Sequence, residues 1–241
     1  MPAFDLAGAM QALAAADERL GRLIAETLEF RVESDGTESP YETLLESITY
    51  QSISGKAAET IFGRIRALGK NGKAPEPEEM LRLQKRVLRK AGLSGAKIAA
   101  MKDLARKTLD GVVPTREESE KMTDKELIDR LVSVRGIGAW TVEMYLIFRL
   151  GRPDILPIHD LGVQKGFALT YGKRYIPKPA ELQKFGERWR PYRTVASWYM
   201  WRACEREASK ARKIGKAPVR KKRGKRTSGR GRAAKAGKLR G

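Results

Sequence analysis

Two glycines separated by a single residue are the feature of this chain with the clearest chemical meaning. Gly136 and Gly138 flank Ile137 between two apolar runs. Glycine lets the backbone turn sharply and keeps side chains out of the way, so that backbone N–H groups can approach a bound anion. The spacing therefore predicts a hairpin whose amides bind a phosphate group.

The segments on both sides of this hairpin have helical patterns. Thr123 and Glu126 have the spacing of a capping box at the start of a helix over 124–131. After the hairpin, apolar residues recur at helical spacing over 140–150. The pattern therefore predicts two helices joined by a hairpin.

An aspartate further along the chain is a candidate for electrostatic chemistry. Asp160 stands just before a helical run that ends near Tyr171. On spacing alone the simplest interpretation is a helix N-cap, although a catalytic carboxylate can fill that role as well. His159, the only histidine, invites an acid–base role, but it cannot make a metal site with the residues visible nearby.

Helical signals dominate the rest of the chain, and the sequence shows no convincing strand pair or repeat. Ser39 and Pro40 suit the cap and first position of a helix, with Glu42 completing a capping box, and Thr115 offers another cap. The predicted helices lie within 6–28, from 40 onward, and at about 55–68, 78–90, 95–110, 124–131, 140–150, 160–171, 179–189 and 191–209. We therefore expect an all-α body over residues 1–209.

Composition narrows the class of protein. No apolar run approaches the roughly 20 residues of a membrane span, and the N-terminus lacks the pattern of a secretion signal. We therefore expect an intracellular protein with no membrane partner. The single cysteine, Cys204, excludes an internal disulfide or an iron–sulfur cluster built from this chain alone.

The net charge of +20 is concentrated at the C-terminus. Residues 210–241 contain 15 Lys or Arg and no acid, whereas the other 209 residues carry 34 basic and 29 acidic residues, a net of +5. Such a composition predicts a basic tail, disordered when unbound, whose charge favours nucleic acid. A solubilising tail, or a nuclear-targeting run through KKRGKR at 221–226, is the alternative.

Four separated segments resemble the helix-hairpin-helix DNA glycosylases, most closely the 3-methyladenine DNA glycosylase II branch. They are YETLLESITYQSISGKAAETIFGRI at 41–65, VRGIGAW at 134–140, HDLGVQKG at 159–166 and RWRPYRTVASWYMWR at 188–202, in the order expected of that family. The resemblance implies two helical lobes: a middle lobe over roughly 40–150 and a second lobe formed by the ends of the chain. It also implies a short form that lacks the N-terminal sheet domain of larger relatives.

By this resemblance Asp160 is the catalytic aspartate. Cleavage of an N-glycosidic bond develops positive charge on the deoxyribose, and a nearby carboxylate stabilises that charge. The same carboxylate can orient or deprotonate water. An alkylated purine that carries positive charge is already a good leaving group, so electrostatics and positioning suffice without a strong general acid.

Trp140 separates two branches of the family. In the branch that also cuts the strand, a lysine nucleophile at this position forms a Schiff base with the sugar. Trp140 has no amine, so the resemblance implies a monofunctional enzyme that leaves an abasic site. Strand cutting through Lys165 is an alternative without motif support, and core packing is the alternative role for Trp140.

The resemblance also implies which residues hold the base and the DNA backbone. The extruded base would lie against Trp140, Met144 and Tyr192, and the Tyr192 ring would attract a cationic base. The backbone would be bound by Gly136, Ile137, Gly138 and Thr141. Trp198 and Trp201 are interpreted as core residues. No cofactor is expected, except for a possible Na⁺ or K⁺ at the carbonyls of Val134 and Gly136.

One position departs from the family pattern. After Gln51, relatives place a long side chain that fills the gap left by the flipped base, but this chain has Ser52. Serine is too short for that gap. Either Gln51 or Tyr50 substitutes for it, or the enzyme depends on lesions that leave the helix easily.

The sequence thus predicts an all-α, two-lobed helix-hairpin-helix DNA glycosylase with a disordered basic C-terminal tail. The expected function is monofunctional excision of alkylated purines, such as 3-methyladenine and 7-methylguanine, from double-stranded DNA by a monomer. The alternative is a noncatalytic binder of damaged or abasic DNA with the same fold, which Ser52 makes conceivable and the presence of Asp160 opposes.

Overall fold

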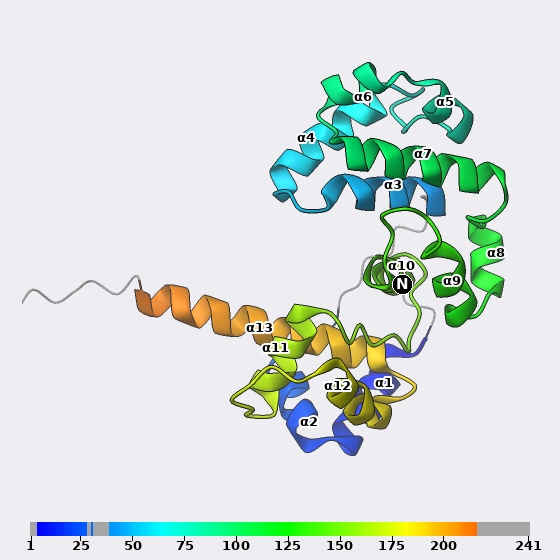
Figure 1. Ribbon diagram of the computed structural model, residues 1–241. Helices are drawn as coiled ribbons and strands as arrows, with labels where there is room; N and C mark the ends of the chain where they lie inside the picture. Colours follow the sequence, from blue (N-terminus) through cyan, green and yellow to red (C-terminus); the bar gives the residue numbers. More distant parts are fainter. Residues whose placement is uncertain (1–3, 28–29, 31–38, 216–241) are drawn as a thin grey trace, which may run out of the picture.

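The computed structural model describes residues 4–27, 30 and 39–215, and every regular element in these ranges is a helix (Figure 1). The elements in chain order are α1 (Leu6–Ala16), α2 (Glu18–Ala25), α3 (Pro40–Tyr50), α4 (Gly55–Arg66), α5 (Pro77–Arg82), α6 (Lys85–Ala91), α7 (Gly95–Leu109), α8 (Arg116–Lys121), α9 (Asp124–Leu131), α10 (Ala139–Phe148), α11 (Leu161–Thr170), α12 (Pro179–Gly186), the 3-10 helix η1 (Glu187–Trp189) and α13 (Arg193–Gly215). The all-α prediction is confirmed. Over the described residues, no helix combines the length and apolar character that a bilayer crossing requires.

The buried apolar side chains form two cores. One core draws on residues 41–155, and therefore on the helices from α3 to α10. The other joins residues 9–30 near the start of the chain to residues 156–200. Figure 1 shows these groups as an upper and a lower body, with α10 between them in that view. Trp201 packs against both cores, so α13 links the two bodies.

The single helix expected within 6–28 is wrong, because Asp17 divides it into α1 and α2. Asp17 has an extended backbone (φ −150°, ψ 104°), and its Oδ1 accepts hydrogen bonds from the amides of Arg19 and Leu20, both at 3.1 Å. Its other oxygen accepts from the Tyr171 hydroxyl at 2.7 Å. These bonds offset the helical bonds lost at the break. The helix expected at 78–90 is likewise divided, into α5 and α6.

Helix starts that depend on local capping are confirmed. The Ser39 side chain accepts from the Glu42 amide at 3.2 Å, and Thr115 and Thr123 each form the predicted capping box. Glu42 was expected to complete a box with Ser39, but its Oε1 instead accepts from the amide of Ala74 at 3.5 Å. This carboxylate therefore holds the loop before α5 rather than the start of α3.

The last helix is longer than the predicted 191–209. It begins at Arg193, whose Nε donates to Asp154 Oδ1 at 2.7 Å and whose amide donates to the same oxygen at 3.3 Å. It continues to Gly215, so the first residues assigned to the basic tail are helical. The prediction for the rest of the tail, 216–241, lies outside the described residues.

Helices α11 and α13 approach each other at a distance that only glycine permits. A Cβ at Gly166 would lie 1.9 Å from the carbonyl oxygen of Met200. Because this neighbour is backbone, no side-chain rotation can relieve the collision. The close contact fixes the start of α11, where Asp160 lies, relative to Trp201 on α13.

Candidate active site

Asp160 caps α11, as its position predicts, and its carboxyl group accepts three hydrogen bonds. Oδ1 accepts from the Val163 amide and from Trp201 Nε1, both at 2.8 Å. Oδ2 accepts from Trp140 Nε1 at 2.7 Å. Three N–H donors suit an ionised carboxylate, which only accepts hydrogen bonds. The two indoles also fix the orientation of the carboxylate between α10 and α13.

Gly162 makes room for the bond between Trp201 and Asp160. A Cβ at this position would lie 2.8 Å from Trp201 Cδ1 and 3.0 Å from Asp160 Oδ1. On another side, the Trp201 ring stacks on Phe148, with ring centroids 5.7 Å apart. Trp201 packs against both cores, as predicted, and in addition it orients Asp160, which the sequence did not predict. Trp198, which is 6% exposed, is confirmed as a core residue.

The hairpin has the backbone that its glycines predict. Gly136 has φ +80°, a conformation that side chains other than glycine rarely adopt. Gly138 has an extended backbone, and a Cβ there would meet nothing within 4 Å. Gly136 therefore makes the turn, whereas Gly138 leaves the outer face of the hairpin open.

Backbone amides at the start of α10 are available to an anion. The amides of Gly136, Gly138, Ala139 and Trp140 have no acceptor within the part of the chain that the structure describes. Two other predicted anchor residues use their amides internally: Ile137 donates to the Val134 carbonyl and Thr141 to the Gly138 carbonyl, both at 3.0 Å. The available amides and the helix dipole together favour a negative ligand.

Lys97, from α7, fixes the loop after α3. Its Nζ donates to the carbonyl oxygens of Thr49 and Gln51, both at 2.7 Å, and burial lowers the pKa of this ammonium group. The Gln51 side chain in turn donates to the Gly136 carbonyl at 2.8 Å, which joins the loop to the hairpin. Ser52 is exposed and has φ +58°.

A cavity of about 440 Å³ lies between the end of α3 and the first turns of α10. Its lining consists of Ser47, Tyr50, Gln51, Ser52, Trp140, Thr141 and Met144. Trp140 is 47% exposed, so it is not a core residue, and its indole extends from this cavity to Asp160. Tyr192 is not part of the lining: its ring packs near Phe4, with centroids 6.2 Å apart, and its role in holding a base stays a prediction.

A second carboxyl group, that of Glu143, lies within the field of Asp160. Glu143 lies on α10 one turn after Trp140, and its Oε2 is buried without a hydrogen-bond partner among the described residues. Burial, and secondly the negative charge of Asp160, raise the pKa of Glu143 to about 7. The two carboxyl groups thus differ sharply in their surroundings.

The predicted cation ligands retain free coordination capacity. The carbonyls of Val134 and Gly136 each accept a hydrogen bond, from the Ile137 amide and from Gln51 Nε2. A carbonyl oxygen has a second lone pair, so both groups fit a monovalent cation, and this site stays a prediction. Across the described ranges, no cluster of three or more His, Cys, Asp or Glu side chains can hold a metal ion.

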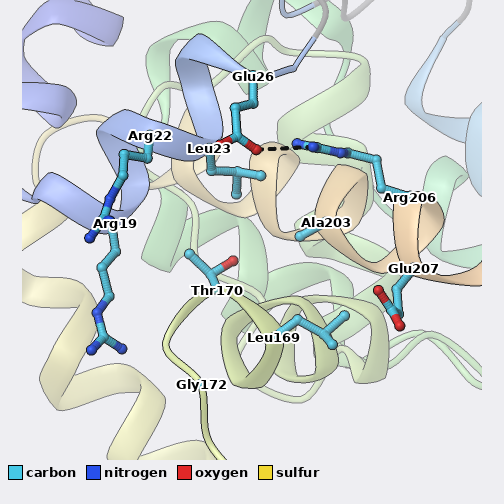
Figure 2. A pocket seen from close by; sticks show the side chains of 10 residues that line it. All are labelled: Arg19, Arg22, Leu23, Glu26, Leu169, Thr170, Gly172, Ala203, Arg206 and Glu207. Atoms are coloured by element: carbon cyan, nitrogen blue, oxygen red, sulfur yellow. Dashed lines mark hydrogen bonds and ion pairs between the residues drawn. The ribbon is translucent and has the colours of Figure 1, made fainter. Parts of the chain in front are cut away.

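A larger cavity, of about 540 Å³, lies elsewhere, between α2, the end of α11 and α13 (Figure 2). Arg19, Arg22 and Arg206 lie on its wall. Arg206 pairs with Glu26 at 3.0 Å, and the Arg19 guanidinium donates to a backbone carbonyl at 2.5 Å. This cavity shares no lining residue with the one at Trp140, so size alone does not identify the functional site.

Comparison with known proteins identifies the family. Residues 45–191, more than half of the chain, match the HhH-GPD superfamily of base excision DNA repair proteins. The chain belongs to the HhH-GPD superfamily.

Similar members of the superfamily share most of their length with this chain. DNA-3-methyladenine glycosylase 1 of Schizosaccharomyces pombe is 37% identical over 194 residues, which cover 80% of this chain and 85% of that protein. The structure of the 3-methyladenine DNA glycosylase Mag1 of the same yeast, in complex with abasic DNA, superposes with a TM-score of 0.73 and covers 81% of this chain and 95% of its own. The DNA-3-methyladenine glycosidase of Bacillus halodurans is 33% identical, with a TM-score of 0.75 and coverage of 83% and 91%.

Sequence reasoning missed two residues in the site of this superfamily member. Trp201 has no local signal, because 41 residues separate it from Asp160 and only the packing of α11 on α13 brings them together. Glu143 has a signal that could have found it: it is the only ionisable acid in the otherwise apolar run AWTVEMYLIF of α10. A lone acid in such a run is expensive to bury without a purpose.

Proposed function

We propose that this chain is a monofunctional DNA glycosylase that removes alkylated purines, of the 3-methyladenine and 7-methylguanine type, from duplex DNA and so starts base excision repair. The observation that carries the proposal is the Asp160 carboxylate, held by Trp140 and Trp201 beside the open hairpin. The names of the yeast and Bacillus relatives support the same substrate class. The yeast structure contains abasic DNA, the product that such a reaction leaves.

Asp160 provides the negative charge that bond cleavage needs. When the bond between C1′ and the base nitrogen breaks, its electron pair leaves with the base and the deoxyribose becomes cationic. A preorganised carboxylate stabilises that cation. Water then adds to C1′ and releases its proton to Asp160 or to solvent. A cationic alkylated purine departs as a neutral base, so the step requires no general acid.

Trp140 connects the reacting bond to the place where the base binds. A base in duplex DNA must leave the stack before it can react, at a cost of a few kcal/mol that is lowest for damaged bases. The half-exposed indole offers a stacking surface, and attraction between a cationic base and an aromatic face contributes about 1–2 kcal/mol. Met144 and Thr141 form the adjoining wall.

We expect Gly138→Val to weaken DNA binding about tenfold and leave the protein folded, with a small loss of stability because valine is a poorer N-cap of α10 than glycine. The backbone at Gly138 (φ −100°, ψ 169°) accepts a valine, and a Cβ there meets no protein atom within 4 Å. The new side chain instead occupies the space where a phosphate would reach the free amides, at a cost of about 1.4 kcal/mol. Fluorescence anisotropy with an abasic duplex at fixed salt measures the effect.

Gly63→Val is the matched control for this variant. A Cβ at Gly63 also meets nothing within 4 Å, but the residue lies on the exposed side of α4, away from the hairpin. Equal affinities of the Gly138 and Gly63 variants would mean that the hairpin does not bind the DNA backbone.

The monofunctional assignment is supported by the placement of the lysines that the structure describes around the candidate site. By the family resemblance, members that also cut the strand have a lysine at the position that Trp140 occupies in this chain. Lys97 Nζ is bound by two carbonyl oxygens, and Lys165 is exposed on α11. Within the described residues, no lysine lines the cavity at Trp140.

Base release from methylated duplex DNA tests the proposed function. We expect the protein, acting as a monomer, to release methylated purines and to leave strands that break only after alkaline treatment. Strand breaks without alkali would overturn the monofunctional assignment. Absence of base release together with tight binding to an abasic duplex would instead identify a noncatalytic binder of damaged DNA.

A further inference from the structure

We propose that Glu143 is a positioning residue that sets the amount of negative charge beside Asp160. When Glu143 is a neutral acid, Asp160 carries the negative charge of the site. When Glu143 is a carboxylate, it adds a second negative charge that accelerates base release. The inference rests on the proposed function and concerns how the same site is controlled.

The surroundings of Glu143 do not explain it as a structural residue. Other partly buried acids of this chain have partners: Glu46 pairs with Arg149 at 3.3 Å, and Asp154 with Arg193 at 2.7 Å. Glu143 Oε2 is buried and has no partner among the described residues. A buried carboxyl group without a partner destabilises a fold, so a role in the site is the simpler explanation for its presence.

The position of Glu143 connects it to the reacting carboxylate. It follows Trp140 by one turn of α10, and Trp140 Nε1 donates to Asp160 Oδ2 at 2.7 Å. Residues three apart on a helix lie on the same side. Trp140 is thus bonded to Asp160 and lies on the same side of α10 as Glu143, and the negative charge of Asp160 acts on Glu143.

Charged groups on the helices around α10 do not neutralise Glu143. On α3, Glu46 is held by Arg149; on α9, Asp124 pairs with Arg152 at 3.4 Å; on α13, Arg202 pairs with Glu205 at 2.6 Å. Among the described residues, Asp160 is the one charged group whose field raises the pKa of Glu143. The ionisation of Glu143 is therefore linked to the negative charge of Asp160.

Ionisation of Glu143 affects the transition state more than the bound substrate. As a cationic purine leaves, positive charge moves from the base to the sugar, towards Asp160. A second negative charge beside Asp160 favours the later charge distribution, and such differential stabilisation raises the rate. Burial and the charge of Asp160 raise the pKa of Glu143 to about 7, so the rate rises with pH through neutrality.

Single-turnover base release across this pH range tests the inference. For the wild type we expect a rise on the order of tenfold, centred near neutral pH, which is the order of effect expected of one added charge in a partly screened site. Glu143→Gln keeps the shape of the side chain without its ionisation, so its rate should stay at the low-pH level throughout. Glu120→Gln, an exposed acid paired with Arg116 at 2.9 Å, should keep the wild-type profile. If Glu143→Gln does not fold, Glu143→Met is expected to give the same flat profile.

A second measurement does not depend on activity. The chain has four tryptophans, so their indole N–H signals are readily assigned by NMR. The Trp140 signal should titrate near neutral pH in the wild type and lose this titration in Glu143→Gln. An unchanged pH profile and titration in the variant would overturn the inference alone, whereas no base release from the wild type at any pH would overturn the proposed function and the inference with it.

Discussion

Replacement of Asp160 by asparagine is expected to slow base release about 10²–10³-fold and leave the protein folded. Asparagine caps a helix as well as aspartate does, so its Oδ1 can keep the bonds from the Val163 amide and Trp201 Nε1. Two things are lost: the negative charge, and an acceptor for Trp140 Nε1. The asparagine NH2 group would face the indole N–H, and two donors cannot bond to each other.

Asp5→Asn is the matched control, because Asp5 caps α1 in the same way, with its Oδ1 accepting from the Gly8 amide at 3.0 Å. Single-turnover rates and melting temperatures of both variants separate catalysis from capping. Asp160→Ala should lose a further ~1 kcal/mol of stability, because it also removes the cap. If Asp160→Asn kept more than a tenth of the wild-type rate, Asp160 would be only a cap, and the proposed mechanism would fail.

Features that depend on a few neighbouring residues could be predicted from the sequence. The turn at Gly136 follows from the freedom of glycine to adopt positive φ, and the caps at Thr115, Thr123 and Asp160 follow from side chains that bond to amides within the next turn. These interactions are local, and the surrounding fold leaves them unchanged at these positions. At Glu42 the fold does intervene, because the carboxylate bonds to the Ala74 amide instead of completing the box with Ser39.

Features that depend on contacts between distant segments could not be predicted. The break at Asp17 is stabilised by Tyr171, and the bond between Trp201 and Asp160 requires glycine at 162 and 166, where α11 meets α13. In the sequence these glycines are only mildly unfavourable helix residues. Their necessity becomes visible when a Cβ is placed against the neighbouring helix.

The loop after α3 is a further case in which contacts between distant segments could not be predicted. The sequence identifies Ser52 as too short to fill the gap of a flipped base and offers Gln51 or Tyr50 instead. In the structure the Gln51 side chain is bonded to the Gly136 carbonyl, whereas Tyr50 and Ile53 are 38% and 39% exposed on either side of the loop tip. Pairing between the loop and the hairpin decides which side chains are available, and that pairing spans 85 residues.

Glu143→Gln is expected to stabilise the protein at neutral pH. Its pKa rises from 4.5 to about 7 on folding, so between these values the folded state keeps a proton that the unfolded state has released. The unfolded state then binds fewer protons, and the free energy of unfolding of the wild type falls as pH rises through this window. Glutamine has no proton to lose. Between acid and neutral pH, the free energy of unfolding of the variant should therefore rise by about 2 kcal/mol relative to that of the wild type, after allowance for partial solvent screening.

Urea unfolding at pH values below and above this window measures the gain, with Glu120→Gln as the control that should show none. A difference between variant and wild type that does not change with pH would mean that Glu143 ionises in the folded state as it does in the unfolded chain. We expect the loss of stability and the rise in the rate of base release to have the same pH midpoint, because ionisation of Glu143 causes both. If the two midpoints agree, Glu143 contributes a charge to the reaction at Asp160; a buried acid with no role would change stability with pH but not the rate.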